Sequence, residues 1–206
     1  MPAFPREITP MESTPFQMAG AMSNWGHSGK SQHRSFMQAG RVWTETYPPF
    51  KANGIEGRKF LALINDFWRT GTEFTISHYN YLTRNGTGGP GTPLVQGASQ
   101  TGATLTTDGW GINQSNVLRA GDIVKIAGIK RVFDVTADAS SNGVGTGVAI
   151  ISINPPIFVG GSPADNAALT INGVALDAFI YSDPNLPSIG ANQYIGGLTL
   201  TFRESV

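Results

Sequence analysis

The 206-residue chain contains no cysteine, which excludes disulfide scaffolds, thiolate zinc sites and cysteine nucleophiles. Charged residues are also scarce, at 14% of the chain against roughly 25% in ordinary globular proteins, and the formal net charge is +0. Nucleic acids and anionic membranes bind basic surfaces. The sequence therefore predicts neither of them as a partner, and its low charge leaves more surface for protein contacts.

Long hydrophobic runs are absent too. No stretch approaches the roughly 18 apolar residues that a membrane-spanning helix requires. The N-terminal stretch MPAFPREITPMESTPF contains acidic residues and prolines and lacks the apolar segment of a secretory signal. We therefore expect a soluble protein that is made in a cytoplasm.

Glycine and proline, by contrast, are abundant, with 26 and 13 residues, and they favour short strands joined by turns. Residues 1–35 are polar, interrupted by four prolines, and show neither helical nor strand periodicity, so we expect a long extended arm. Such an arm has no core of its own and becomes ordered only against another surface, which in a closed ring is the next subunit. The apolar side chains expected to make this contact are Phe16, Met18, Met22, Trp25 and Phe36.

One helix and several strands follow the arm. Residues 53–71 place Phe60, Ile64 and Phe67 at helical spacing, and Gly71 follows as a C-terminal cap. Alternating residues predict strands in RVWTETY and in TEFTISH. A last strand is predicted in LTLTFR, near the C-terminal end of the sequence, and we expect it to pair with one of these two.

The pattern changes after RNGTGGPGTP, a Gly- and Pro-rich stretch typical of a linker. Beyond it, short strand patterns and turns follow at close intervals, including Asn142-Gly143, a strong hairpin signal. We therefore predict two domains. Residues 1–91 and 192–206 form the first domain, and residues 92–191 form an accessory β domain inserted into it.

The motifs that would indicate catalysis or metal binding are each incomplete in this sequence. NWGHSGKS has Asn24 where a phosphate-binding loop requires glycine, and DASSNG lacks the acid of a calcium loop because Ala149 occupies its position. The three histidines show no metal-binding spacing, and no Gly-x-Ser-x-Gly nucleophile motif is present. We predict no catalytic residue, no cofactor and no metal site, and hence a protein that is not an enzyme.

Two tryptophans, Trp25 and Trp110, stand in glycine-rich surroundings outside the strand and helix patterns. Exposed tryptophans stack on sugar rings or anchor protein interfaces, so Trp110 is a candidate contact for a ligand or partner. The interpretation that we favour is that Trp110 closes one end of a small β-barrel. A carbohydrate-binding module that recognises a host glycan is therefore a second functional hypothesis.

The order of these pieces resembles the distal tail proteins and related minor tail proteins of long-tailed bacteriophages. The resemblance rests on the proline-rich start, on QAGRVWTETYPPF, on the helix KFLALINDFW and on the strand GTEFTISH. Residues 91–157 are similar to an accessory β domain that recurs in phage tail proteins. The sequence lacks anything identifiable as a receptor-binding arm.

The resemblance implies a mainly β fold: a β-sandwich with one α-helix and a long extended arm, plus a small inserted β-barrel or β-sandwich domain. It also implies a hexameric ring in the virion tail, assembled in the host cytoplasm, that binds the tail tube protein and the tail hub or fibre proteins. Residues 23–37 would wrap the neighbouring subunit. The ring core would involve Val42, Trp43, Phe60, Ile64, Phe67 and Trp68. A head–tail neck completion protein is a further alternative, because it also assembles symmetrically.

Overall fold

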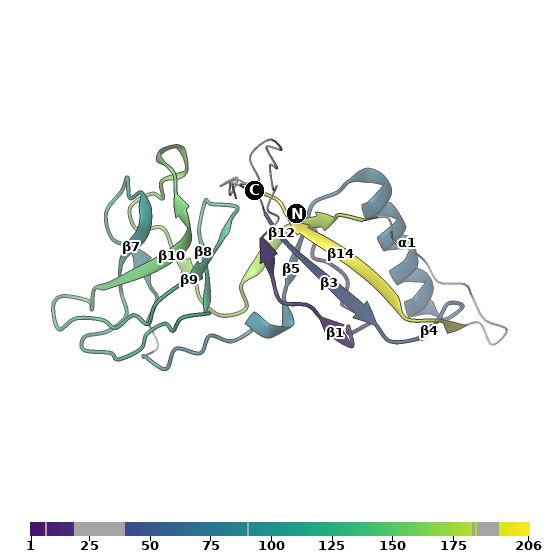
Figure 1. Cartoon of the computed structure of the whole chain (residues 1–206), viewed down its shortest axis with the longest axis horizontal. Coiled ribbons are helices and arrows are strands. Elements are labelled where there is room, and N and C mark those ends of the chain that lie inside the picture. Colours follow the sequence, from purple (N-terminus) through teal and green to yellow (C-terminus); the bar gives the residue numbers. More distant parts are fainter. Residues whose placement is uncertain (7, 19–39, 90, 183, 185–193) are drawn as a thin grey trace, which may run out of the picture. The chain divides into compact units, whose positions relative to one another are not determined.

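A computed structural model describes residues 1–6, 8–18, 40–89, 91–182, 184 and 194–206 (Figure 1). These residues are mainly β-strands with one α-helix, which confirms the predicted fold class. The chain divides into two compact units, the first formed by residues 1–76 and 177–206 and the second by residues 77–176. The predicted boundaries, 91/92 and 191/192, thus differ from the observed division by about 15 residues at each junction.

The first unit is built on a six-stranded sheet with the order β1-β3-β14-β12-β5, in which β2 also pairs with β3. These strands are β1 (Glu12–Ser13), β2 (Gln17–Met18), β3 (Arg41–Tyr47), β5 (Phe74–Ser77), β12 (Ala175–Ile180) and β14 (Leu198–Glu204). β14 pairs with β3 along its length, from Leu198 opposite Tyr47 to Arg203 opposite Val42 (Figure 1). Of the two expected partners of the last strand, RVWTETY and TEFTISH, the structure shows the first.

The second neighbour of β14 is β12, with Ala178 opposite Glu204. Sequence reasoning placed residues 175–180 in the accessory domain, and the structure corrects this by placing them inside the first sheet. The residues between β5 and β12 form the second unit, and these two strands are neighbours in the sheet order. The second unit is therefore inserted without interrupting the sheet that carries it.

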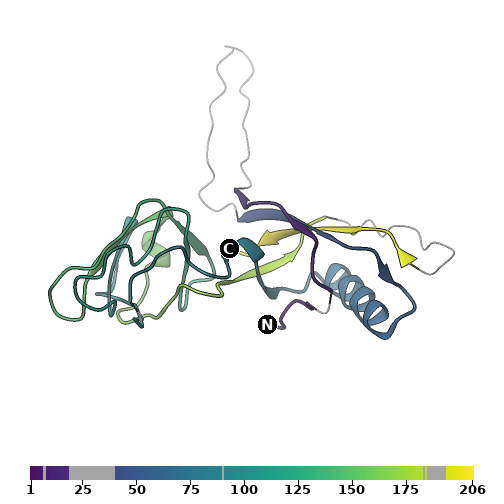
Figure 2. The ribbon, with the colours of Figure 1, turned by 90° about the horizontal axis from the view of Figure 1, so that it is seen from below.

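The helix α1 (Ile55–Thr70) covers one face of this sheet (Figure 2). It ends where Gly71 adopts a left-handed φ of 61°, and the amide of Gly71 donates to the carbonyl of Trp68. Its buried stripe contains Phe60, Ile64 and Phe67, as the spacing predicts. Trp68, which the resemblance assigned to the core, is instead 39% exposed.

The first residues of the chain belong to this core and not to an extended arm. Ala3 forms a parallel bridge with Thr75, and the ring of Phe4 lies 4.9 Å from that of Phe74 and 5.1 Å from that of Phe202. Phe4 is 4% exposed. The expectation of an arm beginning at residue 1 is therefore wrong for these residues, because a single buried aromatic ring fixes them between the helix and the sheet.

A further pair of short strands lies in the first unit. β4 (Phe50–Lys51) pairs antiparallel with β13 (Tyr194–Ile195), with Phe50 opposite Ile195. The ring of Phe50 also lies 5.7 Å from that of Phe60 in α1. The residues before β14 are thereby joined to the residues before the helix.

The second unit is a nearly closed barrel with the strand order β11-β8-β9-β10-β7-β6. Its strands are β6 (Leu94–Val95), β7 (Gly102–Asp108), β8 (Ile123–Ile126), β9 (Val132–Val135), β10 (Ala149–Ile157) and β11 (Leu169–Thr170). The two ends of the sheet meet because the amide of Leu169 donates to the carbonyl of Pro93 over 2.9 Å and Leu94 bridges Ala168. Of the two predicted forms of the inserted domain, a β-barrel and a β-sandwich, the structure shows a nearly closed barrel.

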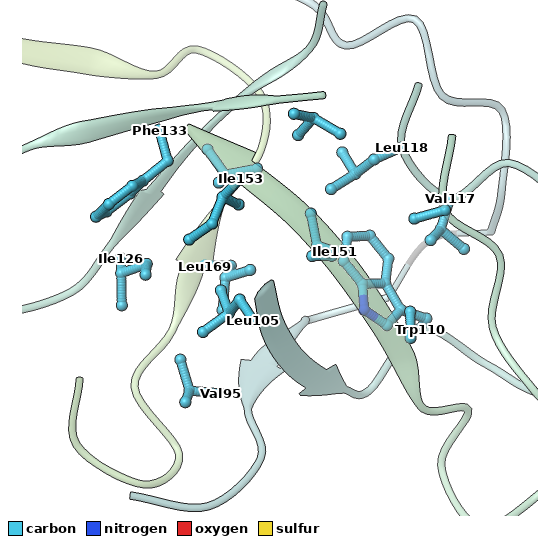
Figure 3. Packing of buried hydrophobic residues seen from close by; sticks show 14 of the residues in the cluster. Val95, Leu105, Trp110, Val117, Leu118, Ile126, Phe133, Ile151, Ile153 and Leu169 are labelled. Atoms are coloured by element: carbon cyan, nitrogen blue, oxygen red, sulfur yellow. The ribbon is translucent and has the colours of Figure 1, made fainter. Parts of the chain in front are cut away.

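The barrel interior is filled mainly by aliphatic side chains (Figure 3). Every second residue of β10 points inward, which buries Ile151 and Ile153 and leaves Ile150 63% exposed. Trp110 lies among these aliphatic side chains and is 1% exposed. The alternating pattern of the sequence thus places these aliphatic side chains in one apolar core.

The predicted linker RNGTGGPGTP is packed against the barrel in its described residues. The guanidinium of Arg84 donates to the carbonyls of Val117 over 2.8 Å and Gly88 over 2.6 Å. A Cβ at Gly86 would lie 2.4 Å from the carbonyl oxygen of Val117. Glycine is therefore needed here for close approach, and the interpretation of this stretch as a linker is wrong.

Candidate functional site

Most of the residues predicted to contact a neighbouring subunit fall outside the described part of the chain. Met22, Trp25 and Phe36 lie there, as does the predicted wrapping segment 23–37. Phe16 and the backbone of Met18 are described, together with Gly40 and the strand β3 that follows it. The candidate site is therefore built from the residues on both sides of 19–39. We call this group, formed by Phe16, Gly40, Arg41, Trp43 and Glu204, the β2–β3 corner.

Backbone pairing brings the two sides of the β2–β3 corner together. Met18 is the register partner of Arg41, and Gln17 is the partner of Val42. A Cβ at Gly40 would lie 2.2 Å from the carbonyl oxygen of Glu204. β14 thus approaches so closely that only glycine fits at the position before β3.

A buried ion pair fixes this corner. The Nη1 atom of Arg41 donates to both carboxylate oxygens of Glu204, over 3.3 and 3.2 Å, and the backbone amide of Arg41 donates to the same carboxylate over 3.1 Å. Both side chains are 1% exposed. Removing one member of such a pair leaves an uncompensated buried charge, which typically costs about 3–5 kcal/mol. Glu204 therefore ties the end of the chain to the first residue of β3.

Aromatic rings extend the same contact. The guanidinium carbon of Arg41 lies 5.6 Å from the ring centre of Phe16, and the Phe16 ring meets Trp43 edge-on at 5.3 Å. Trp43 in turn stacks on Phe202 of β14 at 5.4 Å. Phe16 is thus half-buried against its own chain. Its predicted contact with a neighbouring subunit stays a prediction.

A second buried carboxylate lies on the same face of β3. Glu45 accepts two hydrogen bonds from the guanidinium of Arg6, over 2.6 and 3.1 Å, and one from the hydroxyl of Tyr47 over 2.7 Å. Sequence reasoning missed this site, although the alternation of β3 already placed Glu45 on the same face as Trp43 and Tyr47. The arrangement neutralises a buried charge and stabilises the sheet.

Trp110 is buried in the apolar core of the second unit. Its Nε1 atom donates to the hydroxyl of Thr107 over 2.8 Å, and that hydroxyl donates to the carbonyl of Ala149 over 2.9 Å. The guanidinium of Arg84 lies 5.9 Å from its ring centre. A sugar ring would reach Trp110 only if the core opened, because the side chain is 1% exposed.

Polar residues line a small pocket in the second unit. It has a volume of about 40 Å³ and is bordered by Arg84, Asn85 and Asp122. The carboxylate of Asp122 accepts hydrogen bonds from the amides of Asn85 over 2.6 Å and Arg119 over 2.8 Å. This volume suits roughly one water molecule, whereas ligand pockets usually measure about 300–1,000 Å³. Asp122 thus serves to hold loops together.

Metal binding and membrane insertion find no support in the described residues. Within them, no group of three or more His, Asp or Glu side chains is placed to hold a metal ion. His78 is buried, and its Nδ1 atom accepts a hydrogen bond from the amide of Asn80 over 3.2 Å. Among the same residues, no helix is long and apolar enough to cross a membrane.

The functional inference rests mainly on how the strands and the inserted unit are arranged in the chain. The sequence matches no protein-family model and no curated protein. The features that bear on function are the insertion of the barrel into the first sheet, the return of β14 to the middle of that sheet, and the buried Arg41–Glu204 pair.

Proposed function

We propose that this protein is a structural virion protein of the tail tip or baseplate of a long-tailed bacteriophage. Copies assemble into a symmetric ring, with six subunits, that connects the tail tube protein to the tail hub or fibre proteins. The observation that carries the proposal is the position of the second unit, which is inserted between the adjacent strands β5 and β12. This organisation is the one that the resemblance implies for a ring-forming domain with an accessory β domain.

In this proposal the first sheet carries the barrel, and the insertion of the barrel does not weaken the sheet. β14 lies between β3 and β12, and its inward side chains Leu198, Leu200 and Phe202 are 0% exposed. The first sheet is therefore complete whether or not the barrel contacts a partner. This arrangement suits two separate roles. The ring domain assembles with copies of itself, and the accessory domain contacts other proteins.

The contact between neighbouring subunits is assigned in this proposal to the segment that begins and ends at the β2–β3 corner. The Arg41–Glu204 pair and the Phe16–Trp43 contact fix both ends of that segment. Amide exchange tests the assignment. We expect residues 19–37 to exchange rapidly in the monomer and slowly in the assembled state, and equal protection in both states would contradict the assignment.

The ring itself is tested by size-exclusion chromatography with light scattering, followed by electron microscopy of the eluted particles. A closed ring is the expected result, and a chain that stays monomeric both alone and with the tail tube protein would exclude it. Electron microscopy of virions with a labelled copy then distinguishes the tail tip from the neck. A label at the neck would assign the protein to head–tail completion instead.

The carbohydrate-binding alternative is tested in parallel on a glycan array. The burial of Trp110 removes one of the two tryptophans on which this alternative depends, and Trp25 lies outside the described residues. We expect no glycan to be retained. Binding by a monomeric protein, abolished in the variant Trp25→Ala, would favour the alternative over the ring.

A further inference from the structure

Asparagine stands directly before glycine at four described positions, Asn53, Asn85, Asn142 and Asn172, and all four asparagines are exposed. Such a pair can lose the side-chain amide of its asparagine without an enzyme. The reaction begins when the backbone nitrogen of the glycine attacks the Cγ atom of the asparagine, and a glycine offers no side chain to hinder this approach. The sequence makes the four pairs equivalent, whereas their hydrogen bonds in the structure distinguish them.

In two of the pairs the attacking nitrogen is already engaged. The amide of Gly86 donates to the carboxylate of Asp122 over 3.1 Å, and the amide of Gly173 donates to the carbonyl of Leu82 over 2.8 Å. The nitrogen must give up this proton to attack, and the hydrogen bond holds both the proton and the nitrogen in place. Reaction at Asn85 and Asn172 therefore has to wait for a local opening of the structure.

The pair at Asn142 lies in the loop between β9 and β10, and its glycine nitrogen is not engaged in this way. Among the described residues, none accepts a hydrogen bond from the amide of Gly143. Gly143 is also exposed, so water and base can reach the amide proton. The nucleophile of this pair is therefore available in the folded protein.

The carbon that would be attacked is activated at the same time. The Oδ1 atom of Asn142 accepts hydrogen bonds from the amides of Val144 over 3.2 Å and Val148 over 3.0 Å. Attack on Cγ transfers negative charge to Oδ1, and two backbone amides aimed at an oxygen that gains charge stabilise it, as in an oxyanion hole. The bond to Val144, two residues along, also closes a ring of atoms that includes the Gly143 nitrogen and so keeps Cγ near it.

The other pairs lack one or the other of these features. The Oδ1 atom of Asn172 accepts a hydrogen bond from the amide of Arg84 over 3.2 Å, but its glycine nitrogen is engaged. Asn53 precedes α1, and no described residue donates a hydrogen bond to its carboxamide. Of the four described pairs, the one at Asn142 combines an available nitrogen with a carbonyl that is held by two donors.

We propose that Asn142 is a site of self-modification, at which the folded protein converts its own asparagine into aspartate or isoaspartate. The Gly143 nitrogen forms a bond to Cγ, the bond from Cγ to Nδ2 breaks, and ammonia leaves with the proton of the Gly143 amide. Water then opens the resulting succinimide. Cleavage of the new bond gives aspartate, and cleavage of the original peptide bond gives isoaspartate, so water is the one co-reactant.

The modification changes the chemistry of this loop. Residues 140–147 contain no ionisable side chain, so either product places a negative charge there. Aspartate keeps an oxygen for the amides of Val144 and Val148. Isoaspartate adds a methylene group to the backbone between the amide of residue 142, which donates to Val148, and its carbonyl, which accepts from Asn113 in the loop between β7 and β8. The inference is independent of the proposed ring, because it requires no partner.

Peptide mapping by mass spectrometry tests the proposal on the full-length folded protein, incubated at mildly alkaline pH in isotopically labelled water. Each conversion incorporates one labelled oxygen. We expect Asn142 to react at least about tenfold faster than Asn85 and Asn172, which require local opening, and faster than Asn53. The three other pairs share the same dipeptide and are therefore matched controls within one molecule.

The same measurement on the chain unfolded in guanidinium chloride separates the effect of the structure from that of the sequence. Unfolding should bring the four rates together, because it slows Asn142 about threefold or more by removing its two donors and releases the engaged nitrogens of the pairs at Asn85 and Asn172. Four similar rates in the folded protein, or faster reaction of Asn142 after unfolding, would overturn the proposal.

The variant Asn142→Gln checks that the label belongs to this residue. Glutamine keeps the carboxamide but would have to close a six-membered ring, which forms far more slowly. We expect the peptide that contains residue 142 to stay unlabelled in this variant, with the rate at Asn53 unchanged. Label that persists in that peptide would assign the reaction to another residue and refute the proposal.

Discussion

In the first unit the strand at the centre of the sheet, β14, comes from the last residues of the chain, whereas in the second unit all six strands lie within residues 77–176. The Arg41–Glu204 pair of the first unit joins residues 163 positions apart. Contacts between such distant residues are slow to form because a long loop must close first. The comparison teaches that the barrel can form from its own stretch, while the first unit depends on residues from both ends of the sequence.

The interiors of the two units differ in chemistry as well. The first contains a cluster of aromatic rings around Phe4, Phe60 and Phe202, and two buried carboxylates that are each paired with arginine. The second is aliphatic around Trp110. Buried ion pairs are sensitive to the loss of one partner, whereas an aliphatic core responds mainly to changes in volume and backbone fit. A substitution in the core of one unit should therefore destabilise that unit and leave the other folded.

The largest expected effect is that of deleting residues 197–206. The deletion removes β14 and exposes the inner edges of β3 and β12, so the first unit should unfold while the barrel stays folded. Amide exchange resolved by peptide measures this directly. We expect protection to be lost in α1 and kept in β7 and β10. Loss of protection in the barrel with α1 still protected would contradict the assigned division.

Breaking the ion pair should destabilise the first unit selectively. We expect Glu204→Ala to lower its free energy of unfolding by about 3–5 kcal/mol, because the guanidinium of Arg41 is left buried without its carboxylate. The control is Arg69→Ala, which removes an exposed pair with Asp66 and should cost less than about 1 kcal/mol. Chemical denaturation followed by the circular dichroism of α1 reports the difference. Equal effects of both variants would show that burial of the pair is unimportant.

A single methyl group should destabilise the second unit selectively. In Gly147→Ala the new Cβ would collide with the carbonyl of Gly111, and φ is 82°, so we expect a loss of at least about 2 kcal/mol. Gly145→Ala is the control, with φ of 60° and no atom within 4 Å of the added Cβ, and it should cost about 1 kcal/mol. Amide exchange in β10 measures both. A larger effect of Gly145→Ala would contradict the close approach of the two loops.

The smallest expected effect concerns a short-range contact in the barrel. The side chain of Gln100 accepts a hydrogen bond from the amide of Thr106 over 2.6 Å and donates to the carbonyl of Gln96 over 2.8 Å. Gln100→Ala should cost about 1 kcal/mol, because water replaces these partners at a half-buried site. The exposed Gln96 serves as the control, and Gln96→Ala should change stability by less than about 0.5 kcal/mol. Thermal unfolding that ranks these variants in the opposite order would refute the role of Gln100.

Local patterns were sufficient to predict much of the fold. The helix was recognised from the spacing of Phe60, Ile64 and Phe67, and β14 from its strict alternation, because both patterns reflect which side chains face a core. For the partner of β14, the alternating patterns left two candidates, β3 and β5, and the structure shows that it is β3. All three strands share an alternating pattern, which does not distinguish between the two partners.

The candidate site was less accessible to prediction. The sequence indicated which face of β3 holds Glu45, but its partner Arg6 is 39 residues away and carries no periodic signal. The ion pair of Arg41 with Glu204 was missed for the same reason. Such partners are selected by packing in three dimensions, which no local pattern records.

The sequence by itself determined the fold class, the helix, the strands with regular alternation and the low charge that favours protein contacts. Tertiary structure alone decided that β12 completes the first sheet, that glycines 86 and 88 pack against the barrel, and that Trp110 is buried. The physical reason is common to all three. Whether a short strand, a glycine or a tryptophan is exposed depends on which distant backbone comes to lie against it.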